Sequence, residues 1–370
     1  MHSRIRLLPL LLSMLLCSHL AVADEKADRN RAPKSLRLVD AHLHYVNFMQ
    51  ETNGTQELIA AMDEAGVDKA WIFGLPVIKK WDANAPKRPR YYLGDEAPLY
   101  YFSGTDDILA RDLLALAPSE RQRFAPFISG FNPTDMNAAR QIELLIQRYP
   151  GLWEGIGEIL TRHDALTALT SGETARADHP ALMQVYKVAA KHHLPVLLHS
   201  NLSSLREDEP IYQPELENAL KANPDTRFVL AHAGTSESIE ALQKPIANLP
   251  EILGDLLARY NNLAIDLSWS VRDHYLFKGS KKNRETVDER WLELIEKYPD
   301  RFLLGSDKVG KFTGLDKNLK GYQALLDRLQ PATAERLASR NALALLPPRG
   351  AGNIAVSEEP NLALTETELK

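Results

Sequence analysis

The chain has 370 residues, of which 44% are hydrophobic and 25% charged, and its formal net charge is −5 at pH 7. This length suits one large α/β domain or two small ones. The acidic balance, without a cluster of lysine and arginine, argues against nucleic acid as a partner. The only cysteine is Cys17, so the chain cannot form an internal disulfide.

The first 23 residues have the pattern of a secretory signal peptide. Two arginines precede an apolar run at 7–16, and a small–x–small cleavage site follows at 21–23. The run is too short to span a bilayer, and the bulky Leu16 before Cys17 disfavours a lipoprotein signal. Cleavage after Ala23 would remove Arg4 and Arg6 and change the formal charge from −5 to −7. We expect a periplasmic or secreted protein without a membrane span after processing.

Short apolar runs typical of buried parallel strands recur along the rest of the chain. Eight are predicted as strands: Arg37–His42, Lys69–Phe73, Phe124–Ser129, Trp153–Ile159, Leu194–His199, Arg227–His232, Leu263–Leu267 and Arg301–Ser306. Amphipathic patterns between them predict helices at Gln56–Glu64, Asp106–Leu116, Ala138–Arg148, Pro180–Lys191, Ser236–Arg259 and Thr286–Lys297.

The alternation of strand and helix predicts an α/β fold, a (β/α)8 TIM barrel in a single domain at 24–346. A doubly wound open sheet is the competing architecture, but it usually has fewer strands. Residues 347–370 are polar and acidic without periodicity and are predicted to be a flexible tail. Long loops after strands two, four, five and seven would surround the C-terminal mouth of the barrel, and the first of them, 74–105, is rich in aromatic residues.

Histidines and carboxylates stand at the C-terminal ends of several predicted strands. His42 and His44 are one residue apart on the first strand, so both side chains point to the same face. Glu158 ends the fourth strand and Asp307 follows the eighth; His199 and His232 end the fifth and sixth. Each residue alone has an ordinary structural explanation, such as helix capping by Asp307. Together they predict a metal site with nitrogen and oxygen donors, for which zinc is the first choice.

Short motifs stand on strands one, four, five, six and eight, in the order Asp-x-His-x-His, Gly-Glu, His, His-Ala-Gly and Gly-Ser-Asp. This order resembles the amidohydrolase superfamily. Within it, the chain is most similar to the amidohydrolase-2 branch of metal-dependent TIM-barrel hydrolases and decarboxylases, including the helix-to-strand turn at 62–70. The resemblance covers about Leu38 to Leu345.

The resemblance implies a divalent metal, one or two ions, with His42, His44, His199 and Asp307 as ligands. His232 would bind a second metal or polarise the substrate carbonyl. Many members carry a carboxylated lysine on strand four, whereas this chain has Glu158, which would either bridge two metals, as in TatD-type enzymes, or orient a ligand. Asp307 would accept the proton of a metal-activated water.

The expected reaction is hydrolysis of a small amide, ester or lactone. A non-oxidative decarboxylase is the main alternative, and a TatD-like nuclease or a non-catalytic metal-binding protein is less favoured. Substrate contacts are proposed for Arg272, Lys308, Trp269 and Trp81, each of which could equally be an ordinary surface or packing residue. Barrels of this kind often form homodimers, and the sequence leaves that question open.

Overall fold

The computed structural model describes residues 36–81, 87–90, 97–207, 209–237, 246–278 and 286–348. The chain divides into two units, Met1–Leu36 and Arg37–Lys370, and all described residues except Leu36 belong to the second. The signal peptide predicted at 1–23 and nearly all of the tail predicted at 347–370 lie outside the described residues.

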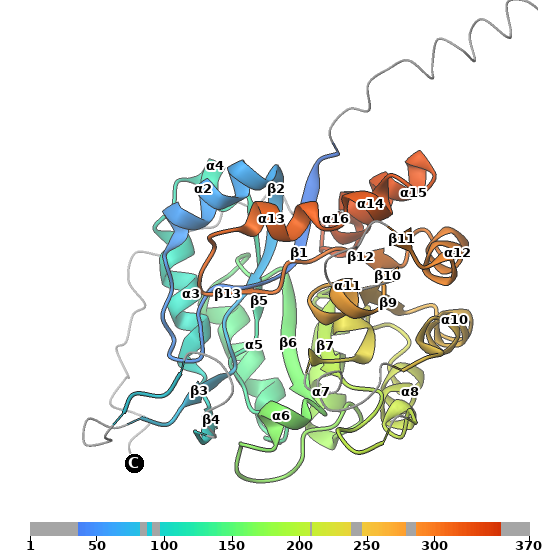
Figure 1. Ribbon diagram of the computed structural model, residues 1–370. Helices are drawn as coiled ribbons and strands as arrows, with labels where there is room; N and C mark the ends of the chain where they lie inside the picture. Colours follow the sequence, from blue (N-terminus) through green and yellow to red (C-terminus); the bar gives the residue numbers. More distant parts are fainter. Residues whose placement is uncertain are drawn as a thin grey trace, which may run out of the picture. The chain divides into compact units, whose positions relative to one another are not determined.

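All eight predicted strands form, with modest differences at their ends, and they lie in one parallel sheet (Figure 1). They are β1 (Leu38–His44), β2 (Val67–Phe73), β5 (Phe124–Ile128), β6 (Gly155–Thr161), β7 (Val196–Ser200), β8 (Phe228–Leu230), β9 (Leu263–Asp266) and β12 (Phe302–Leu303). Each strand pairs with the next of this series, and a further strand, β13 (Lys308–Val309), pairs with β1. The predicted (β/α)8 TIM barrel is therefore confirmed.

The eighth strand closes the barrel in two parts. β12 pairs with β9, and β13 pairs with β1 in the register Leu43 to Lys308. Between them, the Ala41 N–H donates to the Leu304 carbonyl at 2.9 Å. Gly305 allows this approach, since a Cβ there would lie 2.5 Å from the His42 Cβ. The break between β12 and β13 is where Asp307 lies.

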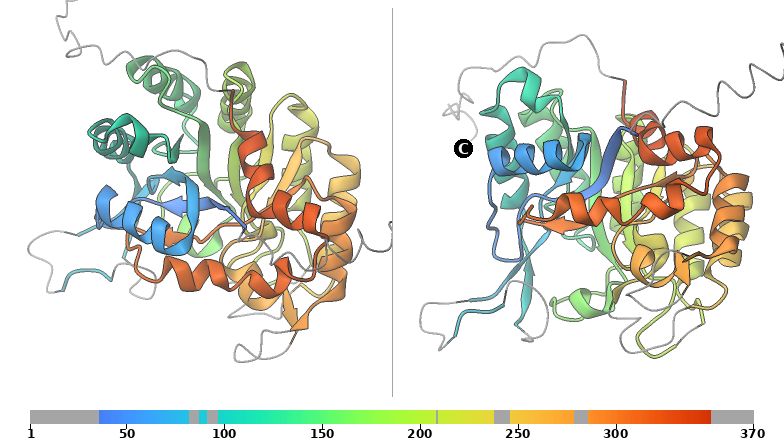
Figure 2. Two further views of the ribbon diagram at one scale, coloured as in Figure 1. Left: turned by 90° about the horizontal axis from the view of Figure 1, so that it is seen from above. Right: turned by 45° about the horizontal axis from the view of Figure 1, so that its top comes forward.

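Helices surround the sheet on the outside, as the view from above shows (Figure 2). The longer ones are α2 (Thr55–Ala65), α3 (Gly104–Leu114), α5 (Ala138–Arg148), α7 (Pro180–Lys191), α8 (Gln213–Ala222), α10 (Leu249–Arg259) and α12 (Glu289–Lys297). The shorter ones are α4 (Pro118–Arg121), α6 (Asp164–Thr167), α11 (Ser270–His274), α13 (Leu315–Lys320), α14 (Gln323–Leu326), α15 (Pro331–Glu335) and α16 (Asn341–Leu345), with a 3-10 turn η1 (Ala231–Gly234) and a π-helical turn η2 (Arg336–Arg340). The described helices include none that is long and apolar enough to cross a membrane.

Two helix predictions differ from the structure. The helix predicted at Ser236–Arg259 is interrupted, because residues 246–248 form a turn; Glu237 is helical, and residues 238–245 lie outside the described residues. α10 begins at Leu249 with a proline in its first turn, where the missing N–H has no helical partner to lose. The helix predicted at Thr286–Lys297 begins at Glu289, where the Asp288 side chain accepts from the Arg290 N–H. Thr286–Val287 instead forms β11, which pairs with β10 (Phe277–Lys278).

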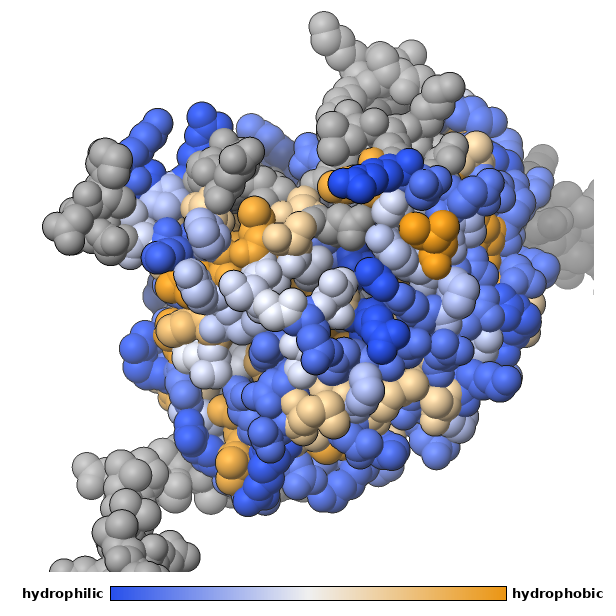
Figure 3. All heavy atoms as spheres, turned by 90° about the horizontal axis from the view of Figure 1, so that it is seen from below, coloured by the Kyte–Doolittle hydropathy of each residue, from blue (hydrophilic) through white to orange (hydrophobic). Residues whose placement is uncertain are grey.

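The long loop after β2 contains an antiparallel pair that the sequence analysis did not predict. β3 (Val77–Lys79) pairs with β4 (Leu99–Tyr101). In Figure 1 this pair and α6 lie at the bottom of the barrel, the side toward which the parallel strands run. Figure 3 shows the molecule from that side, with hydrophobic residues in small separate groups between hydrophilic ones.

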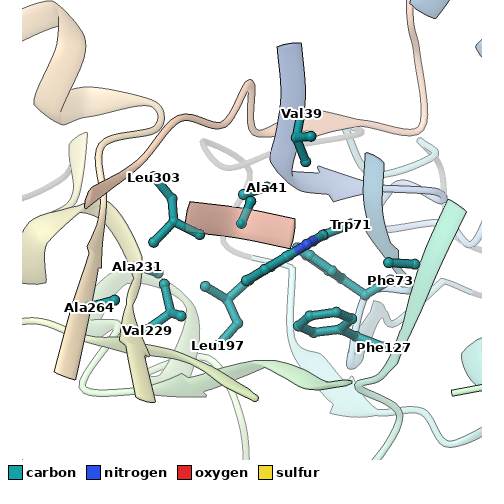
Figure 4. Packing of buried hydrophobic residues seen from close by; sticks show 12 residues of the cluster. Val39, Ala41, Trp71, Phe73, Phe127, Leu197, Val229, Ala231, Ala264 and Leu303 are labelled. Carbon is teal, nitrogen blue, oxygen red and sulfur yellow. The ribbon is translucent and has the colours of Figure 1, made fainter. Parts of the chain in front are cut away.

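The interior of the barrel is filled by buried apolar side chains from most of its strands (Figure 4). Trp71 and Phe127 pack with ring centroids 4.8 Å apart, and Leu197 is fully buried beside them. Dense packing of this kind gives the strand ends fixed positions. The polar residues at those ends are therefore held on a rigid base.

Candidate metal centre and active site

The six predicted metal-site residues come together at the C-terminal mouth of the barrel. Two lie on β1, one on β6, one on β7, one in η1 after β8, and one between β12 and β13. In chain order they are His42, His44, Glu158, His199, His232 and Asp307. All are buried except Asp307, whose side chain is 11% exposed. The strand prediction that ended at His232 is thus slightly wrong, since His232 lies in a turn with φ 51°.

Glu158 lies at the centre of this group. Its Oε1 is 2.9 Å from His199 Nδ1, 3.4 Å from His232 Nε2 and 3.7 Å from His42 Nε2, and its Oε2 is 3.3 Å from His44 Nε2. Burial alone would raise the pKa of Glu158. The charge of His42, followed by the hydrogen bond with His199 and the nearby rings of His232 and His44, outweighs burial and holds that pKa well below its usual value. Glu158 is therefore a carboxylate, the form that binds a cation.

Two donor sets share His42. One consists of His42, His44 and Asp307, and the other of His42, Glu158 and His232, with the ligand atoms of each set within 4.8 Å of one another. Asp307 Oδ1 is 3.5 Å from His42 Nε2 and 3.4 Å from His44 Nε2. Imidazole and carboxylate donors of this kind suit zinc and other divalent first-row metals.

The nitrogens of His42 show how well the site fits a cation. Nδ1 faces Asp266 Oδ2 at 2.9 Å, whereas the fully buried Nε2 has no hydrogen-bond partner among the described residues. Burial lowers the pKa of His42, but the carboxylates of Asp266 and Glu158 raise it to about 10 overall. A positive charge is thus favoured at this point, and a divalent cation would supply it.

His44 is oriented by the protein backbone. Its Nδ1 lies 3.0 Å from the Gly74 carbonyl, which can only accept a hydrogen bond. The proton of a neutral His44 ring is therefore on Nδ1, and the Nε2 lone pair faces Glu158 and Asp307. Such second contacts fix the tautomer of a metal-binding histidine.

Asp266 is a site residue that the sequence analysis missed. It ends β9, is completely buried, and contacts His42 and Ser268. Burial raises its pKa, but the charge of His42 and the hydrogen bonds around it lower the pKa overall. The available signal was an aspartate at the end of an otherwise apolar strand, at the same level as the predicted ligands.

His163 was also missed, because it lies in the loop after β6 rather than at a strand end. Its buried ring stacks on His199 with centroids 4.3 Å apart, and its Nδ1 has no partner among the described residues. Burial, followed by the neighbouring His199, holds the pKa of His163 well below its usual value. His199 Nε2 in turn lies 3.1 Å from Asn201 Oδ1.

The four predicted substrate-contact residues are in different surroundings. Trp269 lies beside the site, its ring 5.2 Å from that of His232. Arg272 is buried, and its guanidinium donates to the Asn318 carbonyl at 2.7 Å and to Asp273 at 2.8 Å. Lys308 Nζ donates to the Thr313 carbonyl at 2.9 Å. Trp81 is 46% exposed with Arg88 over its ring, and its described contacts do not connect it to the metal ligands.

The barrel with its cluster of histidines and carboxylates at the mouth defines a TIM-barrel protein suited to divalent-metal chemistry. The family model described as amidohydrolase, Amidohydro_2, matches residues 39–347. The chain therefore belongs to the amidohydrolase-2 family, whose superfamily comprises hydrolases and decarboxylases. No curated protein matches the sequence.

Solved structures agree with the fold. A 5-carboxyvanillate decarboxylase from Sphingomonas paucimobilis is similar with a TM-score of 0.50 and 17% identity, over 84% of this chain and 99% of the other. A probable 2-pyrone-4,6-dicarboxylic acid hydrolase from Acinetobacter baumannii, with citric acid bound, has a TM-score of 0.51 and 12% identity, over 84% of this chain and 99% of the other. At these identities the likeness concerns the fold.

Proposed function

We propose that the protein is an exported metal-dependent hydrolase of a small amide, ester or lactone. The observation that carries the proposal is the arrangement around His42, which belongs to two donor sets and whose buried Nε2 has no hydrogen-bond partner among the described residues. Zinc is the favoured metal, with one ion or two. His42, His44, Glu158, His199, His232 and Asp307 are the proposed ligands.

A divalent cation held by these residues would lower the pKa of water from 15.7 toward about 7 and polarise a carbonyl oxygen. Asp307 is the proposed general base. Its side chain is the most exposed of the donors in the two sets, so it can meet both water and substrate. Asp307 would take the proton of the attacking water and later return it to the leaving oxygen or nitrogen. His232 would stabilise the developing oxyanion or bind the cation.

Glu158 favours hydrolysis over decarboxylation. Its carboxylate belongs to one donor set and lies within 3.7 Å of four histidines, including both histidines of the other set. A second cation would serve the activation of water more directly than the loss of carbon dioxide. Trp269 is the proposed wall of the substrate pocket, because its ring contacts that of His232. Arg272 and Lys308 have protein partners, and substrate contacts from them and from Trp81 remain proposals.

The reaction is tested with purified protein in ¹⁸O-labelled water. Lactones, esters and amides form one substrate panel and aromatic carboxylic acids the other. We expect ring opening or cleavage with one ¹⁸O in the product carboxylate, and its loss after chelation. Carbon dioxide release without ¹⁸O incorporation would refute hydrolysis and favour the decarboxylase. Cleavage of single-stranded DNA with Mg²⁺ or Mn²⁺ would instead favour a nuclease, which the acidic chain disfavours. Metal binding without turnover on any panel would favour a binding protein.

A further inference from the structure

Beyond the donor atoms themselves, one buried pair connects two of the histidines. Asp266 and Ser268 follow each other closely at the end of β9, and both are fully buried. The Ser268 N–H donates to Asp266 Oδ1 at 2.9 Å, and the Ser268 hydroxyl lies 2.5 Å from Oδ2. The same Oδ2 accepts from His42 Nδ1 at 2.9 Å, and Ser268 Oγ lies 2.9 Å from His232 Nδ1.

Counting protons fixes the direction of each bond. A carboxylate can only accept, so the single hydroxyl proton of Ser268 is given to Asp266. Toward His232, Ser268 Oγ can then only accept, and the proton of His232 must be on Nδ1. The same reasoning puts a proton on His42 Nδ1, since its partner is the carboxylate of Asp266.

The consequence lies on the other side of both rings. Where a metal ion takes the place of a second ring proton, the rings of His42 and His232, each with its proton on Nδ1, present the lone pair of Nε2. These two nitrogens face Glu158 Oε1 at 3.7 Å and 3.4 Å, and the ring centroids are 4.6 Å apart. Two lone pairs and a carboxylate oxygen facing one another repel unless a cation lies between them.

We propose that Asp266 and Ser268 are positioning residues that set the tautomers of His42 and His232 together, so that both rings offer Nε2 to one cation. The proposal rests on the metal site of the proposed function and assigns His232 to the cation rather than to proton donation toward a substrate carbonyl. Asp266 holds His42 directly, whereas it acts on His232 through the Ser268 hydroxyl.

The test compares Ser268→Ala with Ser203→Ala in the full protein. Ser203 is equally buried, but its hydroxyl has no partner among the described residues, so the control removes the same atom without removing a hydrogen bond. Zinc affinity is measured by competition with a chromophoric chelator, without substrate. We expect Ser268→Ala to bind zinc at least about 10-fold more weakly than wild type, as for other partners of metal ligands. The control should stay within about twofold, and Ser268→Thr should restore most of the affinity.

A second measurement does not depend on a variant that folds. In zinc-loaded wild type with ¹⁵N-labelled histidine, the His232 ring should carry its proton on Nδ1. A proton on Nε2, or wild-type zinc affinity in a folded Ser268→Ala, would overturn the proposal. Neither readout uses substrate. Weakened zinc binding in Ser268→Ala therefore supports the positioning role of Asp266 and Ser268 even if the wild-type enzyme proves to be a decarboxylase.

Discussion

Replacing Asp307 by asparagine separates catalysis from folding. Asparagine has the same shape and tolerates the left-handed backbone at this position, where φ is 51°. The backbone bond from the Asp307 N–H to the His42 carbonyl, 2.8 Å, remains. We therefore expect stability to change by less than about 1 kcal/mol. The amide cannot accept a proton, so kcat should fall by about 10²–10⁴-fold, equivalent to about 3–5 kcal/mol of barrier.

The assay is steady-state hydrolysis of the best substrate from the panel, with zinc content and thermal unfolding measured on the same samples. Asp68→Asn is the matched control, because Asp68 pairs with Arg37 on the surface and its side chain is 45% exposed. That variant should keep wild-type kcat. Near-normal kcat in Asp307→Asn with a full complement of zinc would refute the assignment of Asp307 as general base.

Three further predictions concern the scaffold. Leu197→Ala, which empties a fully buried position inside the barrel, should cost about 2–5 kcal/mol in urea unfolding, and a loss below about 1 kcal/mol would contradict the packing described. Burial raises the pKa of Asp106 to about 7, so the contribution of its protonated side chain to stability is full below about pH 4 and is lost as pH rises through 7. Asp106→Asn should therefore lower the free energy of unfolding more at pH 5 than at pH 8. An equal loss of unfolding free energy at both pH values would contradict that pKa. Gly305→Ala would put a Cβ 2.5 Å from the His42 Cβ and should lower both the melting temperature and the zinc affinity. The control is Gly254→Ala, whose Cβ would lie 3.3 Å from the Leu294 side chain, and it should keep wild-type zinc affinity.

The sequence predicted the barrel well because its strands are apolar runs with a regular spacing. The interrupted eighth strand was harder, since the two pairs of residues in β12 and β13 are too short for a periodic pattern. The strand pair β3–β4 was missed for the same reason. The helix predicted at Ser236–Arg259 is interrupted before Leu249, because apolar periodicity alone does not reveal the turn there.

The site was predicted as far as residues at strand ends can reveal it. His42 and His44 carry a direct signal in their spacing, and parallel strands bring Glu158 to the same end of the barrel. Asp266 also ends a parallel strand, but its role depends on contact with His42, 224 residues away in the chain, which the sequence does not show. His163 lies in a loop, where the sequence does not determine which strand end it will contact.

The central claim is that His42 and His44 hold a catalytic metal, and a metal count with anomalous-scattering density tests it most directly. In the wild-type protein we predict at least one divalent ion per chain, with density beside the Nε2 atoms of both histidines. The His42→Ala, His44→Ala double variant should lose that ion and the activity together. Metal content equal to wild type in the double variant, or density only at a distance from both rings, would contradict the account.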